Sequence, residues 1–111
     1  MLTTQFDEHH HLFFVRHGER ADRAQEIKLE YPESQDPPLT PLGVQQAEET
    51  GQFFKGYLER HPYLDRVVLE TSPFMRTMQT AAGIARVLGI PKVLINYTYC
   101  EWMSTTLFNQ E

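Results

Sequence analysis

The sequence predicts an α/β fold in which a parallel-stranded sheet carries helices on both faces. The first observation is a short run of aromatic and branched apolar residues, which suits a strand buried on both faces. The second is a pair of helical patterns, each introduced by a capping residue and a proline. The third is the order strand, helix, strand, helix, strand, which is typical of a parallel sheet packed against helices.

The three expected strands are short. The first covers residues 12–15 (LFFV) and runs directly into a charged segment. The second covers residues 67–69, and the third covers residues 92–97, after Pro91. Residues 21–38 are polar and contain several prolines, so we expect a long loop between the first strand and the first helix.

Both expected helices have recognisable ends. Thr40 is a good N-cap, Pro41 suits the first helical position, and Pro62 ends the pattern. The residues expected on the buried face recur at three- and four-residue spacing: Val44, Ala47, Gly51, Phe54 and Leu58. We expect Ser72 to cap the second helix and Gly89 to end it. Its buried face is expected to contain Phe74, Met78, Ala81, Ala85 and Leu88.

Length and composition restrict the class of protein. The 111 residues suit one domain, residues 1–111, and a hydrophobic content of 41% is ordinary for a globular chain. A net charge of −5 argues against a general nucleic-acid binder, and the single Cys100 excludes an internal disulfide. No apolar run reaches the ~20 residues of a membrane span. Because acidic residues near the N-terminus are unlike a secretory signal, we expect a soluble, cytoplasmic protein without nucleic-acid or membrane partners.

Three unusual segments follow the expected strands. They are residues 16–20, 70–76 and 97–103. The carboxyl ends of parallel strands lie at the same edge of a sheet, and ligands of such sheets bind there. We therefore expect these segments, although distant in sequence, to form one site.

His17 is the candidate nucleophile. A neutral imidazole can attack a phosphoryl group when its other ring nitrogen is held by an acceptor. Arg16 and Arg20 flank it and can donate paired hydrogen bonds to phosphate oxygens, while Gly18 permits close approach of the backbone. Folding does not require a charged cluster directly after a buried strand, so this cluster indicates function.

Arg76 and Glu101 extend the candidate site. Arg76 is expected in the first turn of the second helix, where its charge and the helix N-terminus both favour an anion. Glu101 follows the third strand and can supply the proton that a leaving alcohol needs. Taken singly, each is typical of an ordinary surface charge. Together with His17 they indicate phosphoryl transfer, which depends on positioning and charge stabilisation.

The charged cluster is part of three blocks that resemble a known family. Residues 14–20 (FVRHGER), 36–47 (DPPLTPLGVQQA) and 71–81 (TSPFMRTMQTA) are similar, in this order, to motifs of the histidine phosphatase (phosphoglycerate mutase-like) superfamily. The resemblance covers residues 12–103. Within the family, the RHGER and CEW sequences look most similar to the Sts-type phosphatases, which are the ubiquitin-associated and SH3-domain-containing proteins.

The resemblance implies an enzyme that hydrolyses a phosphomonoester through a phosphohistidine on His17. Arg16, Arg20 and Arg76 would bind the phosphoryl group, and Glu101 would be the proton donor. The resemblance implies no metal and no organic cofactor. It implies a phosphorylated small molecule or a phosphoprotein as the substrate.

One feature of the family is missing from the sequence. The family site contains a second histidine after a later strand, and this sequence ends at Glu111, before that segment. His61 belongs to the opposite edge of the sheet, and His11 is about 20 Å of extended chain from His17. We therefore expect a partial domain, about the first half of the fold, which a longer product, self-association or a partner chain completes. The alternatives to a phosphatase are a non-catalytic interaction or scaffold module and a member of the mutase branch.

Overall fold

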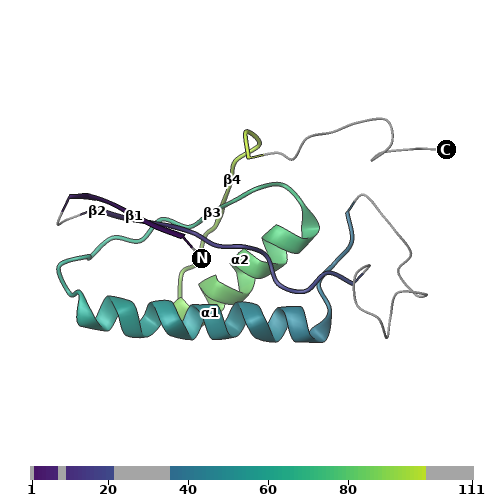
Figure 1. Ribbon diagram of the computed structural model, residues 1–111, viewed down its shortest axis with the longest axis horizontal. Helices are drawn as coiled ribbons and strands as arrows, with labels where there is room; N and C mark the ends of the chain where they lie inside the picture. Colours follow the sequence, from purple (N-terminus) through teal and green to yellow (C-terminus); the bar gives the residue numbers. More distant parts are fainter. Residues whose placement is uncertain (1, 8–9, 22–35, 100–111) are drawn as a thin grey trace.

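The computed structural model describes the backbone of residues 2–7, together with residues 10–21 and 36–99. Its elements, in order, are β1 (Leu2–Asp7), β2 (His10–Phe14), α1 (Pro41–Arg60), β3 (Glu70–Thr71), α2 (Met75–Leu88) and β4 (Leu94–Ile95) (Figure 1). β3 and β4 pair in parallel. The two helices and this parallel pair confirm the predicted α/β class.

The first strand pairs differently from the prediction. β1 and β2 are antiparallel, with Leu2 opposite Phe14 and Thr4 opposite Leu12. Two residues separate these strands, and so short a connection joins antiparallel neighbours, whereas a parallel pair needs a long crossover. The described residues therefore form one antiparallel and one parallel pair instead of a single parallel sheet.

α1 begins and ends as the sequence predicts. The Thr40 hydroxyl accepts a hydrogen bond from the Gly43 N–H at 2.9 Å, and Pro41 occupies the first helical position. This bond satisfies one of the N–H groups that lack a partner within the helix. The helix ends at Arg60, before Pro62, and the His61 N–H bonds back to the Leu58 carbonyl.

α2 begins later than predicted. Its N-cap is Phe74, whose side chain makes no capping bond, so the prediction that Ser72 caps this helix is wrong. The Ser72 hydroxyl instead donates to Thr77 Oγ1 at 2.8 Å. The predicted C-terminus is confirmed, because Gly89 ends the helix with a φ of 72°, a left-handed conformation that glycine adopts without steric cost.

The second and third strands are shorter than predicted. β3 begins just after the apolar segment 67–69, in which Val68 is 57% exposed. The Leu94 N–H donates to the Leu69 carbonyl at 3.0 Å, and the Asn96 N–H donates to the Thr71 carbonyl at 2.8 Å. Pairing is thus concentrated at the carboxyl end of the apolar segment, next to the candidate site.

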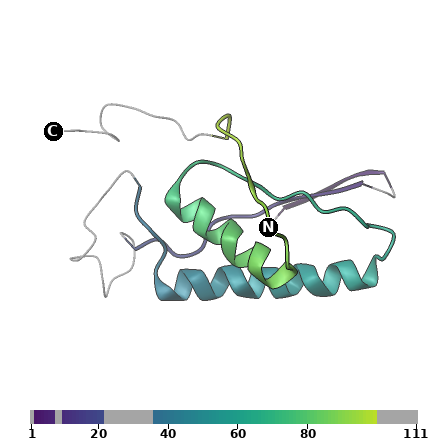
Figure 2. The ribbon, with the colours of Figure 1, turned by 180° about the vertical axis from the view of Figure 1, so that it is seen from behind.

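The two helices pack against each other and lie on the same side of the strands (Figures 1 and 2). Their most buried apolar side chains are Ala47, Ala81, Ile84 and Ala85. Three of these belong to the predicted buried faces. Within residues 10–21 and 36–99 there is one helical layer, and the opposite face of the strands carries no helix.

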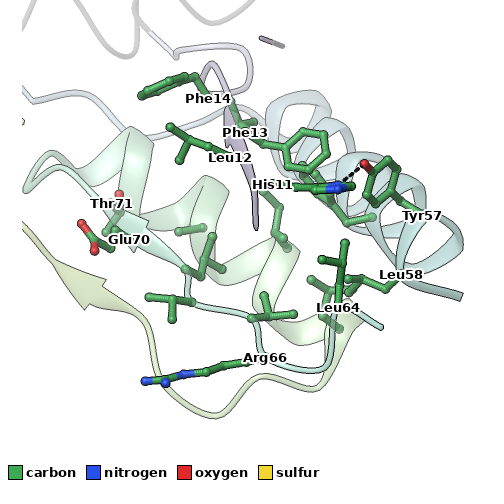
Figure 3. Close-up of a pocket in the computed structure, with 18 of the residues that line it drawn as sticks. His11, Leu12, Phe13, Phe14, Tyr57, Leu58, Leu64, Arg66, Glu70 and Thr71 are labelled. Atoms are coloured by element: carbon green, nitrogen blue, oxygen red, sulfur yellow. Dashed lines mark hydrogen bonds between the residues drawn. The ribbon is translucent and has the colours of Figure 1, made fainter. Parts of the chain in front are cut away.

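An apolar groove separates β2 from the chain that leads into β3 (Figure 3). Its volume is about 1030 Å³, and its lining includes Leu12, Phe14, Val67, Leu69 and Ile84. Phe14 is 53% exposed. Exposed apolar surface of this extent usually meets another segment or chain. Completion of the sheet by such a segment, by self-association or by a partner stays a prediction.

Candidate active site

His17 lies in the loop that follows β2, and one of its ring nitrogens is held by the backbone. Its Nδ1 is 2.7 Å from the Gly18 carbonyl oxygen. Because a carbonyl oxygen can only accept, Nδ1 carries the proton of the neutral ring. The other nitrogen, Nε2, then keeps its lone pair. This is the tautomer that a nucleophilic histidine requires.

The surroundings of His17 favour this neutral form. Burial is the largest influence and lowers the pKa of His17 below its usual value of 6.5. The hydrogen bond to the Gly18 carbonyl opposes this effect. The positive charges of Arg76, Arg20 and Arg16 lower the pKa further, because they disfavour a second cation nearby. All three predicted phosphate-binding arginines therefore act on His17 electrostatically.

Arg76 is the most deeply buried of these arginines. It is the second residue of α2, and its side chain is only 3% exposed. Its guanidinium carbon lies 4.7 Å from the centroid of the Phe74 ring, a cation–π arrangement. Arginine is almost never so buried unless its charge is used or compensated. An arginine in the first turn of a helix is usually an exposed surface charge. The burial of Arg76 shows that it is not one.

Gly18 lets the His17 loop lie directly on the N-terminus of α1. A Cβ added to Gly18 would be 2.4 Å from the Gly43 carbonyl oxygen, and one added to Gly43 would be 2.4 Å from the Glu19 carbonyl oxygen. No side chain fits at these separations. Two glycines from distant blocks of the sequence thus allow one close contact of backbone with backbone.

Glu19 fixes the loop to α1 through three hydrogen bonds. Its carboxylate accepts from the Thr40 hydroxyl at 2.7 Å, and its carbonyl accepts from the Thr40 N–H at 2.9 Å. Its own N–H donates to Gln46 Oε1 at 2.9 Å. Thr40 thereby caps α1 and holds the His17 loop at the same time.

The loop that follows β4 contributes Tyr99. Asn96 Nδ2 donates to the Glu70 carboxylate at 3.2 Å, and a hydrogen bond to the same carboxylate raises the pKa of Tyr99. Tyr99, His17 and Thr71 line the same cavity. The described parts of the segments that follow β2, β3 and β4 therefore border one groove, and convergence of residues 97–103 on the candidate site stays a prediction. Glu101, the predicted proton donor, lies outside the described residues.

The other histidines of β2 and α1 form a separate aromatic cluster. His11, near the start of β2, shares a hydrogen bond of 2.5 Å with the Tyr57 hydroxyl (Figure 3). His61 stacks on Tyr57 with ring centroids 4.1 Å apart, and Tyr63 packs on both histidines. His61 Nδ1 also lies 2.8 Å from the Tyr57 carbonyl oxygen, so hydrogen bonds and ring packing within this cluster account for the positions of His11 and His61.

The described part of the chain was searched for clusters of metal-ligating side chains and for helices that could span a membrane. Residues 10–21 and 36–99 contain no group of three or more His, Cys, Asp or Glu side chains suited to hold a metal ion. Among the helices of the same residues, neither combines the length and apolar character that crossing a bilayer requires.

A family comparison agrees with the geometry of the site. The model of the histidine phosphatase superfamily (branch 1) matches residues 12–102, which is most of the chain. The chain belongs to the histidine phosphatase superfamily. Comparisons with curated proteins and with solved structures gave no match. The resemblance carried by the three sequence blocks is thus confirmed at the level of the superfamily.

Sequence reasoning missed several polar residues that support the candidate site. Thr80 accepts a hydrogen bond from the Gly18 N–H, and Gln46 and Thr40 hold Glu19. Their roles depend on neighbours that are distant in sequence. One signal was available: Thr80 lies four residues after Arg76, a spacing that places both side chains on the same face of a helix.

Proposed function

We propose that this histidine phosphatase superfamily member hydrolyses a phosphomonoester through a phosphohistidine on His17. The observation that carries the proposal is the contact between His17 Nδ1 and the Gly18 carbonyl oxygen, from which the tautomer of His17 follows. The two atoms are 2.7 Å apart, and burial, followed by the charges of three arginines, lowers the pKa of His17. A neutral nucleophile surrounded by fixed positive charge is what attack on a phosphate dianion requires.

In the first step, His17 Nε2 attacks phosphorus and the bond between phosphorus and the alcohol oxygen breaks. The leaving oxygen takes a proton, which we assign to the Glu101 carboxyl group. In the second step, water attacks phosphorus, its proton passes to the Glu101 carboxylate, and the phosphorus–nitrogen bond breaks. Inorganic phosphate leaves, and both His17 and Glu101 return to their starting states.

The arginines have two effects in this proposal. Arg16, Arg20 and Arg76 donate hydrogen bonds to the non-bridging oxygens of the phosphoryl group and stabilise their charge in the transition state. They also disfavour protonation of His17 before the substrate binds. Arrival of the phosphate dianion reverses this second effect, because it neutralises the positive charge around the ring.

The proposed substrates are phosphorylated small molecules or phosphoproteins. The proposed reaction needs no cofactor, because side chains of the protein supply the nucleophile, the positive charge and the proton. The RHGER sequence supports a position near the Sts-type phosphatases within the superfamily. Location in the cytoplasm stays a prediction from the sequence.

Trapping of the phosphoenzyme tests the proposal. The full chain is mixed with a radiolabelled aryl phosphate and quenched in base, where phosphohistidine survives. We expect label on the wild-type chain and on His10→Ala, because His10 is an exposed residue of β2, and no label on His17→Ala. Equal labelling of His17→Ala would overturn the proposal. A folded wild-type chain that binds vanadate but never takes up label would favour the scaffold alternative.

A further inference from the structure

We infer that Thr80 is a positioning residue whose hydroxyl couples the His17 loop to the helix that carries Arg76. The inference rests on the proposed function of His17. It concerns a residue whose hydroxyl bonds to the backbone of Gly18 and of Arg76. Thr80 acts through Gly18 and through the backbone of α2.

Only one orientation of the Thr80 hydroxyl is compatible with both of its hydrogen bonds. The hydroxyl oxygen is 2.7 Å from the Arg76 carbonyl oxygen, which can only accept, so the single hydroxyl proton is directed to Arg76. The oxygen then has lone pairs available for the Gly18 N–H, at 3.1 Å. One buried group therefore joins the backbone of Arg76 to the backbone of Gly18.

Gly18 links Thr80 to the imidazole of His17, because it bonds to both side chains. Its N–H points to Thr80, while its carbonyl accepts from His17 Nδ1 at 2.7 Å. Both backbone polar groups of this residue are thus used, one by α2 and one by the nucleophile. A change in the position of Gly18 would alter the hydrogen bond that sets the tautomer of His17.

Thr80 and Arg76 are fixed relative to each other because they are four residues apart on one helix face. They are 6% and 3% exposed, so neither side chain has much freedom to rearrange. α1 holds the same loop from another side, through Glu19 and Thr40. The structure thus aligns Arg76 with His17 by attaching the loop to both helices. Loss of the Thr80 bond would remove the attachment to the helix that carries the buried arginine.

Thr50 provides a matched control on the other helix. Its hydroxyl donates to the Gln46 carbonyl at 3.0 Å, the same bond to the carbonyl four residues back that Thr80 makes. It lies in the middle of α1 and its bond is exposed to solvent. Thr50→Val therefore removes an equivalent bond to the backbone, while the Gln46 side chain keeps its own bond to the Glu19 N–H.

The test compares wild type, Thr80→Val, Thr80→Ser and Thr50→Val by NMR, without substrate. In the wild type we expect a slowly exchanging Gly18 amide and His17 protonated on Nδ1. In Thr80→Val we expect Gly18 exchange to be at least about tenfold faster and the Nδ1–H tautomer of His17 to be less populated. Thr80→Ser should restore both signals, and Thr50→Val should leave both as in the wild type.

Turnover of an aryl phosphate gives the second readout. Misplacement of reacting groups by less than 1 Å lowers the rate of the chemical step, so we expect Thr80→Val to reduce kcat about tenfold with a smaller change in KM. Thr80→Ser should recover most of the lost rate. A defect in apolar packing would not be repaired by Thr80→Ser, because serine also lacks the methyl group of threonine.

The outcomes separate this inference from the proposed function. If wild type forms no phosphoenzyme but the Gly18 and His17 signals change in Thr80→Val, the proposed function fails and the coupling stands. If wild type is phosphorylated and these signals are unchanged in a folded Thr80→Val, the coupling is wrong. If Thr80→Val does not fold, the exchange rate of the Gly18 amide in the wild type tests the inference. Slow exchange is required, and rapid exchange would overturn it.

Discussion

The two ends of β2 place histidines in opposite surroundings. His17, just after its carboxyl end, is bonded to a backbone carbonyl and lies in the field of three arginines. His11, near its other end, packs edge-to-face against His61 and Tyr63, with ring centroids 5.5 and 6.1 Å away. Both histidines line the same groove. Residue type and access to a cavity therefore do not distinguish a candidate nucleophile, whereas bonding partners and nearby charge do.

The two ends of the helices also differ in their surroundings. At the site end, the N-terminus of α1 and the first turn of α2 are joined to the His17 loop by Thr40 and Thr80. At the far end, α1 finishes among aromatic rings, where His61 stacks on Tyr57. The site end is held by hydrogen bonds to the His17 loop, whereas at the far end hydrogen bonds of His11 and His61 to Tyr57 add to the packing of aromatic rings. Substitutions at equivalent positions of the two ends should therefore have different consequences.

The largest expected difference is between two arginines of α2. Arg76 is buried at the site end, while Arg86, in the last turn, is 63% exposed and pairs with Glu48 at 3.5 Å. Charge-assisted hydrogen bonds contribute about 1.5–3 kcal/mol each, so we expect Arg76→Ala to weaken vanadate binding roughly 10- to 100-fold. Arg86→Ala should bind vanadate as the wild type does. Calorimetric titration measures both, and equal affinities would remove Arg76 from the phosphate site.

Two glycines of α1 should give effects of opposite sign on stability. A Cβ at Gly43 would collide with the backbone of Glu19, whereas one at Gly56 would meet only the flexible end of Arg60, 3.3 Å away. We expect Gly43→Ala to lower the free energy of unfolding by about 1–3 kcal/mol. Gly56→Ala should raise it by about 0.5–1 kcal/mol, because alanine favours the helix. Urea unfolding followed by circular dichroism is the measurement, and a stable Gly43→Ala would contradict the close contact.

A smaller effect is expected from the titration of His17. Its pKa is lowered in the folded chain and lies near 6.5 in the unfolded chain. Between these two values the unfolded chain binds more protons, so stability falls as the pH decreases through this window and levels off below it. His17→Gln removes this contribution. The free energy of unfolding of the variant minus that of the wild type should therefore rise below pH 6.5, and a difference that does not vary with pH would contradict the lowered pKa.

Local signals in the sequence predicted the helices well. Thr40, Pro41 and Gly89 act through bonds and backbone angles within a few residues, so their effects can be read from the chain itself. Ser72 failed as a predicted cap because its hydroxyl finds another partner, Thr77, when α2 begins at Met75. A capping residue followed by proline does not fix the first turn when two starts are close together.

Long-range pairing was the part that the sequence could not specify. β1 was not predicted, and its antiparallel pairing with β2 replaced the expected parallel neighbour. The hydrogen bonds from Thr80 and Gln46 to the His17 loop likewise depend on how distant segments meet. The positions of His17 and Arg76 were predicted because a strand end and a helix start are local features that the topology brings together.

Identification of the phosphorylated atom is the sharpest test of nucleophilic attack by His17. The full chain is labelled on the imidazole nitrogens, phosphorylated with an aryl phosphate and held in base for ³¹P and ¹⁵N NMR. Because Nδ1 of His17 bonds to the Gly18 carbonyl, we expect phosphorus bonded to Nε2 of His17. Phosphorus on Nδ1 of His17, or on any other residue, would contradict it.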